Sequence, residues 1–78
     1  MKITFDPAKR EKTRTERGLD FLDAAKVFGG RTATLTDDRA DYGEVRFQTY
    51  GFLGARVVLI VWTSRGEARH VHIHEVLS

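Results

Sequence analysis

The spacing of apolar residues changes at Arg31, and this change constrains the fold more than any other feature of the chain. Before it, apolar residues recur at the spacing of a helix with one buried face, as at Phe21, Leu22, Ala25 and Phe28. After it, apolar and polar residues alternate, which is typical of strands with one buried face. The pattern predicts an α+β fold in which helices precede most of the sheet.

One short strand and two helices are predicted before the change. Lys2–Phe5 alternates between polar and apolar residues, and the following Asp6-Pro7 is typical of a helix start. The first helix is predicted from Pro7 to about Arg17, with Gly18 ending it. It has almost no apolar residues, so it must rest on other elements through the stems of its long side chains. A second helix is predicted from Asp20 to about Phe28.

Four strands are predicted after the change, over residues 32–36, 45–52, 56–63 and 68–75. The 56–63 segment is the most apolar, which predicts a central strand buried on both faces. The order is β-α-α-β-β-β-β: an antiparallel sheet of about four strands with two N-terminal helices packed on one face, and the first strand as a further edge. The predicted core consists of Phe5, Phe21, Leu22, Ala25, Phe28, Phe47, Val58, Ile60, Trp62, Val71 and Ile73.

The chain has 78 residues, which predicts a single domain over residues 1–78. A domain this small has a thin stability margin, and the absence of cysteine excludes disulfides and thiolate metal sites. A bound partner is therefore the expected support. No apolar run approaches the ~20 residues that span a bilayer, and no secretion signal is visible, so we expect a cytoplasmic chain without membrane contact.

Three histidines alternate with apolar residues in the last predicted strand, as His70-Val71-His72-Ile73-His74. Alternation predicts that the three imidazoles share one face. The outer two would lie about 13 Å apart, too far to share one ion unless a bulge intervenes, and no cysteine can add a ligand. We therefore expect no metal site. A solvated face and a role as acid, base or phosphate contact both remain open, because histidine titrates near neutral pH.

Arginine supplies nine of the thirteen basic residues, and its planar guanidinium pairs bidentately with phosphate. Because adjacent strands are about 5 Å apart, arginines of neighbouring strands can converge on one phosphate. A rim of solvated charges is the alternative. The arginines in or beside the last three predicted strands are Arg46, Arg56, Arg65 and Arg69.

An acidic turn follows the predicted strand at 32–36. Its carboxylates are Asp37, Asp38 and Asp41. They lack the glycine and the closing glutamate of a calcium-binding loop, so we expect a solvated turn.

Several segments taken together are similar to one known family. They are Met1 to Lys9, Arg17 to Phe28, Asp38 to Phe47, Gly51 to Gly54, Val57 to Trp62 and Thr63 to Gly66. In this order they resemble BrnT, the toxin of a type II toxin–antitoxin pair with a RelE-like ribonuclease fold. The similarity covers residues 1 to about 71, and its best single signature is Asp38-Arg39-Ala40-Asp41-Tyr42-Gly43-Glu44-Val45-Arg46-Phe47.

The resemblance implies an endoribonuclease toxin that needs no metal or cofactor and cleaves RNA through attack by the 2′-hydroxyl. It implies a hetero-oligomer with a BrnA-like antitoxin, a ribbon-helix-helix protein that neutralises the toxin and connects it to DNA only indirectly. Glu44 is the expected base, with His72 or His74 as the alternate acid or base. The other expected catalytic residues are Arg46, Arg65 and Arg69, and Lys9 and Arg56 are the expected RNA contacts.

The chain departs from the family pattern at three places. Val45 stands where the family has a second acid, and Arg17 where it often has histidine. In the last strand His74 takes the position of the family's terminal arginine. These departures support an alternative function: a catalytically weakened, toxin-like binding module that complexes a ribbon-helix-helix transcriptional regulator.

Overall fold

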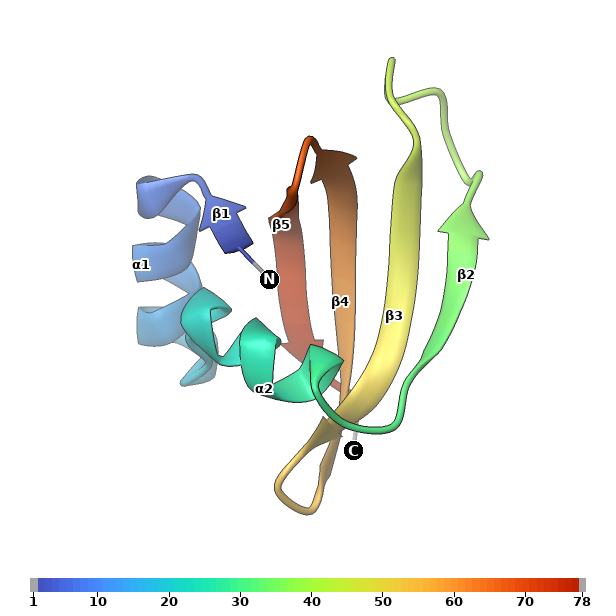
Figure 1. The fold of residues 1–78 in the computed structure, drawn as a ribbon. Coiled ribbons are helices and arrows are strands. Elements are labelled where there is room, and N and C mark those ends of the chain that lie inside the picture. The colour runs from blue at the N-terminus through green and yellow to red at the C-terminus, as the bar shows by residue number, and fades with distance from the viewer. Residues whose placement is uncertain (1, 78) are drawn as a thin grey trace.

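The computed structural model describes residues 2–77 as one five-stranded sheet with helices at one face and one side (Figure 1). The elements are β1 (Lys2–Phe5), α1 (Pro7–Arg17), the 3₁₀ turn η1 (Phe21–Asp23), α2 (Ala24–Phe28), β2 (Ala33–Asp37), β3 (Arg46–Leu53), β4 (Arg56–Arg65) and β5 (Ala68–Val76). None of the helices in the described part of the chain is long and apolar enough to span a membrane.

The sheet has the strand order β1-β5-β4-β3-β2 and is mixed rather than antiparallel. Strands β2 to β5 pair antiparallel with one another in chain order, as predicted; short turns join β3 to β4 and β4 to β5, and a longer loop over residues 38–45 joins β2 to β3. Strand β1 takes the further edge predicted for it, but it pairs in parallel with β5, from Lys2↔Ala68 to Phe5↔Val71, so the prediction of an antiparallel sheet was wrong at this edge. The alternation of a short strand predicts its conformation but not the direction of its partner.

Helix α1 forms where predicted. The Asp6 carboxylate accepts a hydrogen bond from the amide of Ala8 (2.9 Å), and Gly18 ends the helix in the left-handed conformation at φ 67°. None of its residues is buried. It lies at the β1 side of the sheet (Figure 1), where Arg10 makes a bidentate contact with Asp20 and Arg17 donates to Glu75. Polar contacts thus hold this helix in place.

The second predicted helix is shorter than expected and begins as the 3₁₀ turn η1. The 3₁₀ turn has three residues per turn, so Phe21 and Ala24, the first residue of α2, lie on the same face. Val27 follows three residues later in α2, and all three residues are buried. The prediction of Leu22 and Ala25 as core residues was therefore wrong: Leu22 is 50% exposed, and Ala25 is exposed as well.

The core lies between α2 and one face of the sheet. Phe21, Ala24 and Val27 pack there against Val58, Ile60 and Val71, with Phe5, Phe28 and Trp62 partly buried at its rim. The backbone of β3 comes very close to α2 at Gly51, where an added Cβ would lie 2.6 Å from Cγ1 of Val27. Leu19 is also fully buried, although the sequence pattern did not indicate it.

We call the sheet surface opposite α2 the open face. Along β4, Val58 and Ile60 point into the core, so Leu59, Val61 and Thr63 point to the open face. Leu59 and Val61 are nevertheless only 7% and 1% exposed. The prediction that this strand is buried on both faces is confirmed.

A β-bulge interrupts β5 at His72. Val71 pairs with Trp62, and Ile73 pairs with Val61, so His72 is an extra residue between two normal pairs. The bulge changes the face to which later residues point. Ile73 is on the open face and 37% exposed rather than in the core, and the prediction that the three histidines share a face was wrong.

Candidate active site

A cluster of charged and titratable side chains lies on the open face, where β3 begins and β4 ends. At its centre is Glu44, just before β3. One carboxylate oxygen is 3.3 Å from Nη2 of Arg65, and the other is 3.3 Å from Nε2 of His72 and 4.0 Å from Nε of Arg46. The structure therefore brings together four of the eight predicted site residues, from a loop and three adjacent strands.

The tautomer of His72 follows from its hydrogen bonds. Thr63 donates its only hydroxyl proton to the carbonyl of Val45 (3.1 Å). The hydroxyl can then act only as acceptor toward Nε2 of His72, 3.0 Å away, so Nε2 carries the proton. In the neutral ring, Nδ1 is left as an unprotonated nitrogen. His72 therefore faces Glu44 with an N–H group and retains a lone pair on its other nitrogen.

Two further residues extend the cluster toward the β1 side. His70 lies beside His72, with 5.2 Å between the ring centroids, and its Nδ1 is 2.8 Å from the Thr4 hydroxyl of β1. Lys9 of α1 and His72 both line a groove of about 260 Å³ between α1 and β5. The positive charge of Lys9 acts on both histidines and contributes to lowering their pKa values.

Burial and positive charge determine the protonation states of the cluster. Burial, followed by the charge of Arg46, lowers the pKa of His72 to about 4, and burial followed by the charge of Arg65 lowers the pKa of His70. Burial favours protonated Glu44, but the hydrogen bond and charge of Arg65, with the other nearby charges, hold its pKa below the usual value. Near neutral pH the site therefore has an ionised carboxylate, two arginines and two neutral imidazoles.

The acidic turn is more ordered than predicted. Asp37 is 5% exposed and accepts two hydrogen bonds of 2.8 Å from Arg39. The Arg39 hydrogen bond, which outweighs burial, lowers the pKa of Asp37 to about 2. The solvated-turn prediction was therefore wrong for this residue. The turn places Tyr42 under the guanidinium of Arg46, whose Cζ is 4.0 Å from the ring centroid.

Three predicted site residues lie away from the cluster. His74 is 1% exposed on the core face, with Nδ1 3.3 Å from the carbonyl of Asp20. Arg69 also lies on the core face, with its guanidinium 4.3 Å from the ring centroid of Phe28 and 4.8 Å from that of Trp62. Arg56 begins β4 and Arg65 ends it, so these two residues are about 30 Å apart.

Other members of the cluster were not chosen from the sequence. Thr63 gives no local signal, because its contact with His72 depends on the pairing of β4 with β5. His70 was recognised as part of the histidine pattern but not assigned a role. Tyr42 lies within the family-like segment at 38–47, which was the available signal. Among residues 2–77, no group of three or more histidine, aspartate and glutamate side chains is placed to hold a metal ion.

Comparison with known proteins identifies the family. A search of curated proteins gave no match. The family model described as the ribonuclease toxin BrnT of a type II toxin–antitoxin system matches residues 5–74, nearly the entire chain. The resemblance inferred from the sequence is thereby confirmed, and the chain belongs to the BrnT family of ribonuclease toxins.

Proposed function

We propose that this chain is an endoribonuclease toxin that cleaves RNA at the Glu44 cluster, without a metal ion, through attack by the 2′-hydroxyl on the adjacent phosphate. The family match supports the ribonuclease activity. The observation that carries the site assignment is the contact of one carboxylate, Glu44, with Arg65 and His72 on an uncovered sheet face. These are the residue types that such a reaction requires: a base, cations for the phosphate and a titratable imidazole.

Arg46 and Arg65 are the proposed phosphate ligands. The side chain of Arg65 is 51% exposed, so its guanidinium can exchange Glu44 for a phosphate oxygen. Arg46 is held from below by Tyr42, and its buried Nε has no hydrogen-bond partner among the described residues. Two fixed cations stabilise the negative charge that grows on the nonbridging oxygens as phosphorus becomes five-coordinate.

Proton transfer is assigned to Glu44 and His72. Glu44 takes the proton of the 2′-hydroxyl while the 2′ oxygen forms its bond to phosphorus. His72 takes up a proton from solvent when the phosphate binds and so becomes an imidazolium. The bond from phosphorus to the 5′ oxygen then breaks, and this oxygen takes that proton from His72. The products are a 2′,3′-cyclic phosphate and a 5′-hydroxyl end. Glu44 and His72 return to their starting states when Glu44 releases its proton to solvent.

Binding of the phosphate itself prepares these two groups. Arg46 lowers the pKa of His72, and Arg65 lowers the pKa of Glu44. A phosphodiester on the two arginines brings a negative charge next to both groups and offsets the positive charge. Both pKa values then rise toward the working pH, which is where general acid–base catalysis is most effective.

The test is cleavage of a short single-stranded RNA by the purified chain in excess chelator. A matched RNA with a 2′-deoxy group at the cleaved position should resist cleavage, and the product should carry a cyclic phosphate. Arg65→Ala should lower the rate by a factor of about 10²–10³, the usual loss for one contact to a developing oxyanion. Arg14→Ala is the matched control, since Arg14 is 49% exposed on α1, outside the cluster.

Two results would contradict the proposal. One is cleavage that requires a divalent ion. The other is cleavage of the 2′-deoxy substrate at the normal rate, which would exclude attack by the 2′-hydroxyl. If the chain cleaves no RNA but binds its partner, the alternative function, a toxin-like binding module, replaces the proposed one.

The family implies an antitoxin partner. We propose that this partner is a BrnA-like ribbon-helix-helix protein, that the complex is cytoplasmic and that it reaches DNA only through the antitoxin. Co-expression with the product of the neighbouring gene, followed by size-exclusion chromatography, tests this. A neighbouring product that fails to co-elute and fails to inhibit RNA cleavage would contradict it.

A further inference from the structure

The two edges of the sheet differ in their protection. Strand β1 is four residues long and runs directly into α1, which lies on the same side (Figure 1). Among residues 2–77, strand β2 pairs only with β3, and its first four residues, 33–36, are all exposed. It contains no lysine or proline, and its pairing with β3 shows no bulge. Lysine, proline and bulges are among the features that usually prevent an edge strand from pairing with another chain. Because β2 lacks them, its edge is open.

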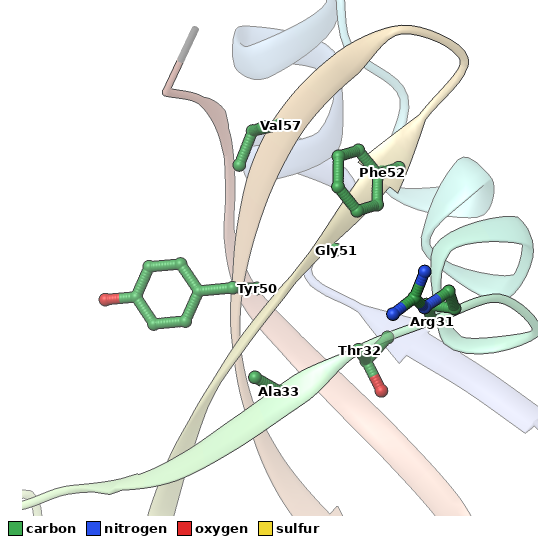
Figure 2. A pocket seen from close by; sticks show the side chains of 7 residues that line it. All are labelled: Arg31, Thr32, Ala33, Tyr50, Gly51, Phe52 and Val57. Atoms are coloured by element: carbon green, nitrogen blue, oxygen red, sulfur yellow. The ribbon is translucent and has the colours of Figure 1, made fainter.

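Apolar side chains on the open face lie beside this edge. Leu35 of β2 is 58% exposed, and Phe52 of β3 is 57% exposed. Between the start of β2 and the end of β3 is a cavity of about 350 Å³ (Figure 2), lined by Arg31, Thr32, Ala33, Tyr50, Gly51, Phe52 and Val57.

We propose that the edge of β2 is the docking site for an extended segment of the antitoxin, which adds to the sheet as a sixth strand. The partner's identity rests on the proposed function. In this arrangement the backbone of the segment bonds to the free edge groups of β2, and its alternate side chains cover Leu35 and enter the cavity beside Phe52. The segment that fits this surface has apolar residues at alternate positions and an acidic residue at one end.

The charge at the cavity supports the acidic end. Arg31 lines the cavity, is exposed and forms no ion pair with any described residue. The chain as a whole carries a formal net charge of +2. A carboxylate at the end of the added strand next to Arg31 would give that guanidinium a partner.

A second copy of the chain fits this edge less well. Two-fold antiparallel pairing of β2 centred on Leu35 would set Arg31 opposite Arg39 of the other copy, at both ends of the pair. Like charges directly opposite each other are destabilising. RNA also fits less well, because its phosphates and bases do not continue a row of backbone amides and carbonyls, whereas a peptide does.

The test uses the full chain, labelled with ¹⁵N, and a defined probe. The probe is a short synthetic peptide in which valine alternates with threonine and glutamate stands at each end. We expect the amide resonances of residues 33–37 to shift on titration. With about nine-tenths of the chain bound, exchange of the outward-facing β2 amides should slow about tenfold, because only the free chain exchanges.

Two matched variants locate the interaction. Leu35→Lys places a charge on the docking surface and should weaken peptide binding about tenfold or more. Leu22→Lys is the control, since Leu22 is 50% exposed on the helical side and should leave binding unchanged. Both variants should cleave RNA at the rate of the original chain. If the peptide binds at β2 but the protein cleaves no RNA, the proposed function is overturned and this inference still holds.

Several outcomes would overturn the inference. One is a peptide that shifts no resonance, or only those of the groove between α1 and β5. Another is a shift of the Leu35 and Phe52 resonances without slower amide exchange in β2, which would mean that the peptide covers the open face without extending the sheet. Self-association abolished by Leu35→Lys would identify a second copy as the occupant. Tighter binding of an oligoribonucleotide at the same residues would identify RNA.

Discussion

Acidification should destabilise this protein well above the pH at which its carboxylates titrate, and His72 should account for much of the loss. The side chain is buried at the β5 bulge, where burial followed by the charge of Arg46 lowers its pKa from 6.5 to about 4. The unfolded chain therefore binds a proton at a higher pH than the folded chain does. The contribution of neutral His72 to the stability of the fold is fully present above pH 6.5 and is lost as the pH falls toward 4.

The size of the loss follows from the two pKa values. Each pH unit between 6.5 and about 4 changes the free energy of unfolding by about 1.4 kcal/mol for one proton, or about 3 kcal/mol in total. A small domain has only about 5 kcal/mol or somewhat more to lose. Asp20 and Asp37, whose pKa values the hydrogen bonds from Arg10 and Arg39 lower to about 2, act only below pH 3.8. The two effects therefore occupy separate pH ranges.

The measurement is urea unfolding at a series of pH values from 7.5 to 4, followed by the fluorescence of Trp62, the only tryptophan. His72→Gln keeps an N–H donor near Thr63 but does not titrate. We expect this variant to lose less stability on acidification than the original chain does, by roughly 3 kcal/mol. An unchanged dependence on pH between 6.5 and 4 would refute the reasoning and assign the loss to His70 or His74, whose pKa values burial also lowers.

Three further substitutions test the packing. Arg69→Ala should lower the free energy of unfolding by about 1 kcal/mol, because the guanidinium loses its aromatic contacts, and it should affect RNA cleavage far less than Arg65→Ala does. A loss of cleavage as large as that of Arg65→Ala would contradict the placement of Arg69 on the core face. Gly51→Ala should lower the free energy of unfolding, measured with heat or urea, by about 1–3 kcal/mol, because the new methyl group meets the stiff, buried side chain of Val27. An unchanged free energy of unfolding would show that α2 moves away freely. Arg39→Ala should raise the pKa of Asp37, measured by NMR, and lower the free energy of unfolding; an unchanged Asp37 pKa would show that other groups keep it low.

Much of the local structure was predictable because its causes lie within a few residues. The Asp6-Pro7 start and the Gly18 end of α1 depend on one side chain and one backbone angle, and both formed as predicted. The hairpins before β4 and β5 turn at Gly54 and Gly66, which adopt positive φ. The family was also predictable, because its segments occur in order along the chain.

The core and the site were predicted less well, for two physical reasons. A 3₁₀ turn at Phe21 changed the spacing of buried residues, so that Ala24 and Val27 took the places expected for Leu22 and Ala25. A single extra residue at His72 reversed the faces of the residues after it, which separated His74 from His72. Both are small changes in backbone geometry that an apolar pattern does not reveal.

By itself, the sequence determined the order and approximate bounds of the helices and strands, which family the chain belongs to and which residue types were available for chemistry. Only the tertiary structure decided which of those residues meet. Glu44 lies in a loop far from Arg65 and His72 in the chain, and the contacts among the three depend on the registers of β3, β4 and β5. A strand's alternation leaves its partner and register open, because pairing energy comes from the neighbouring strand and the core rather than from the strand itself.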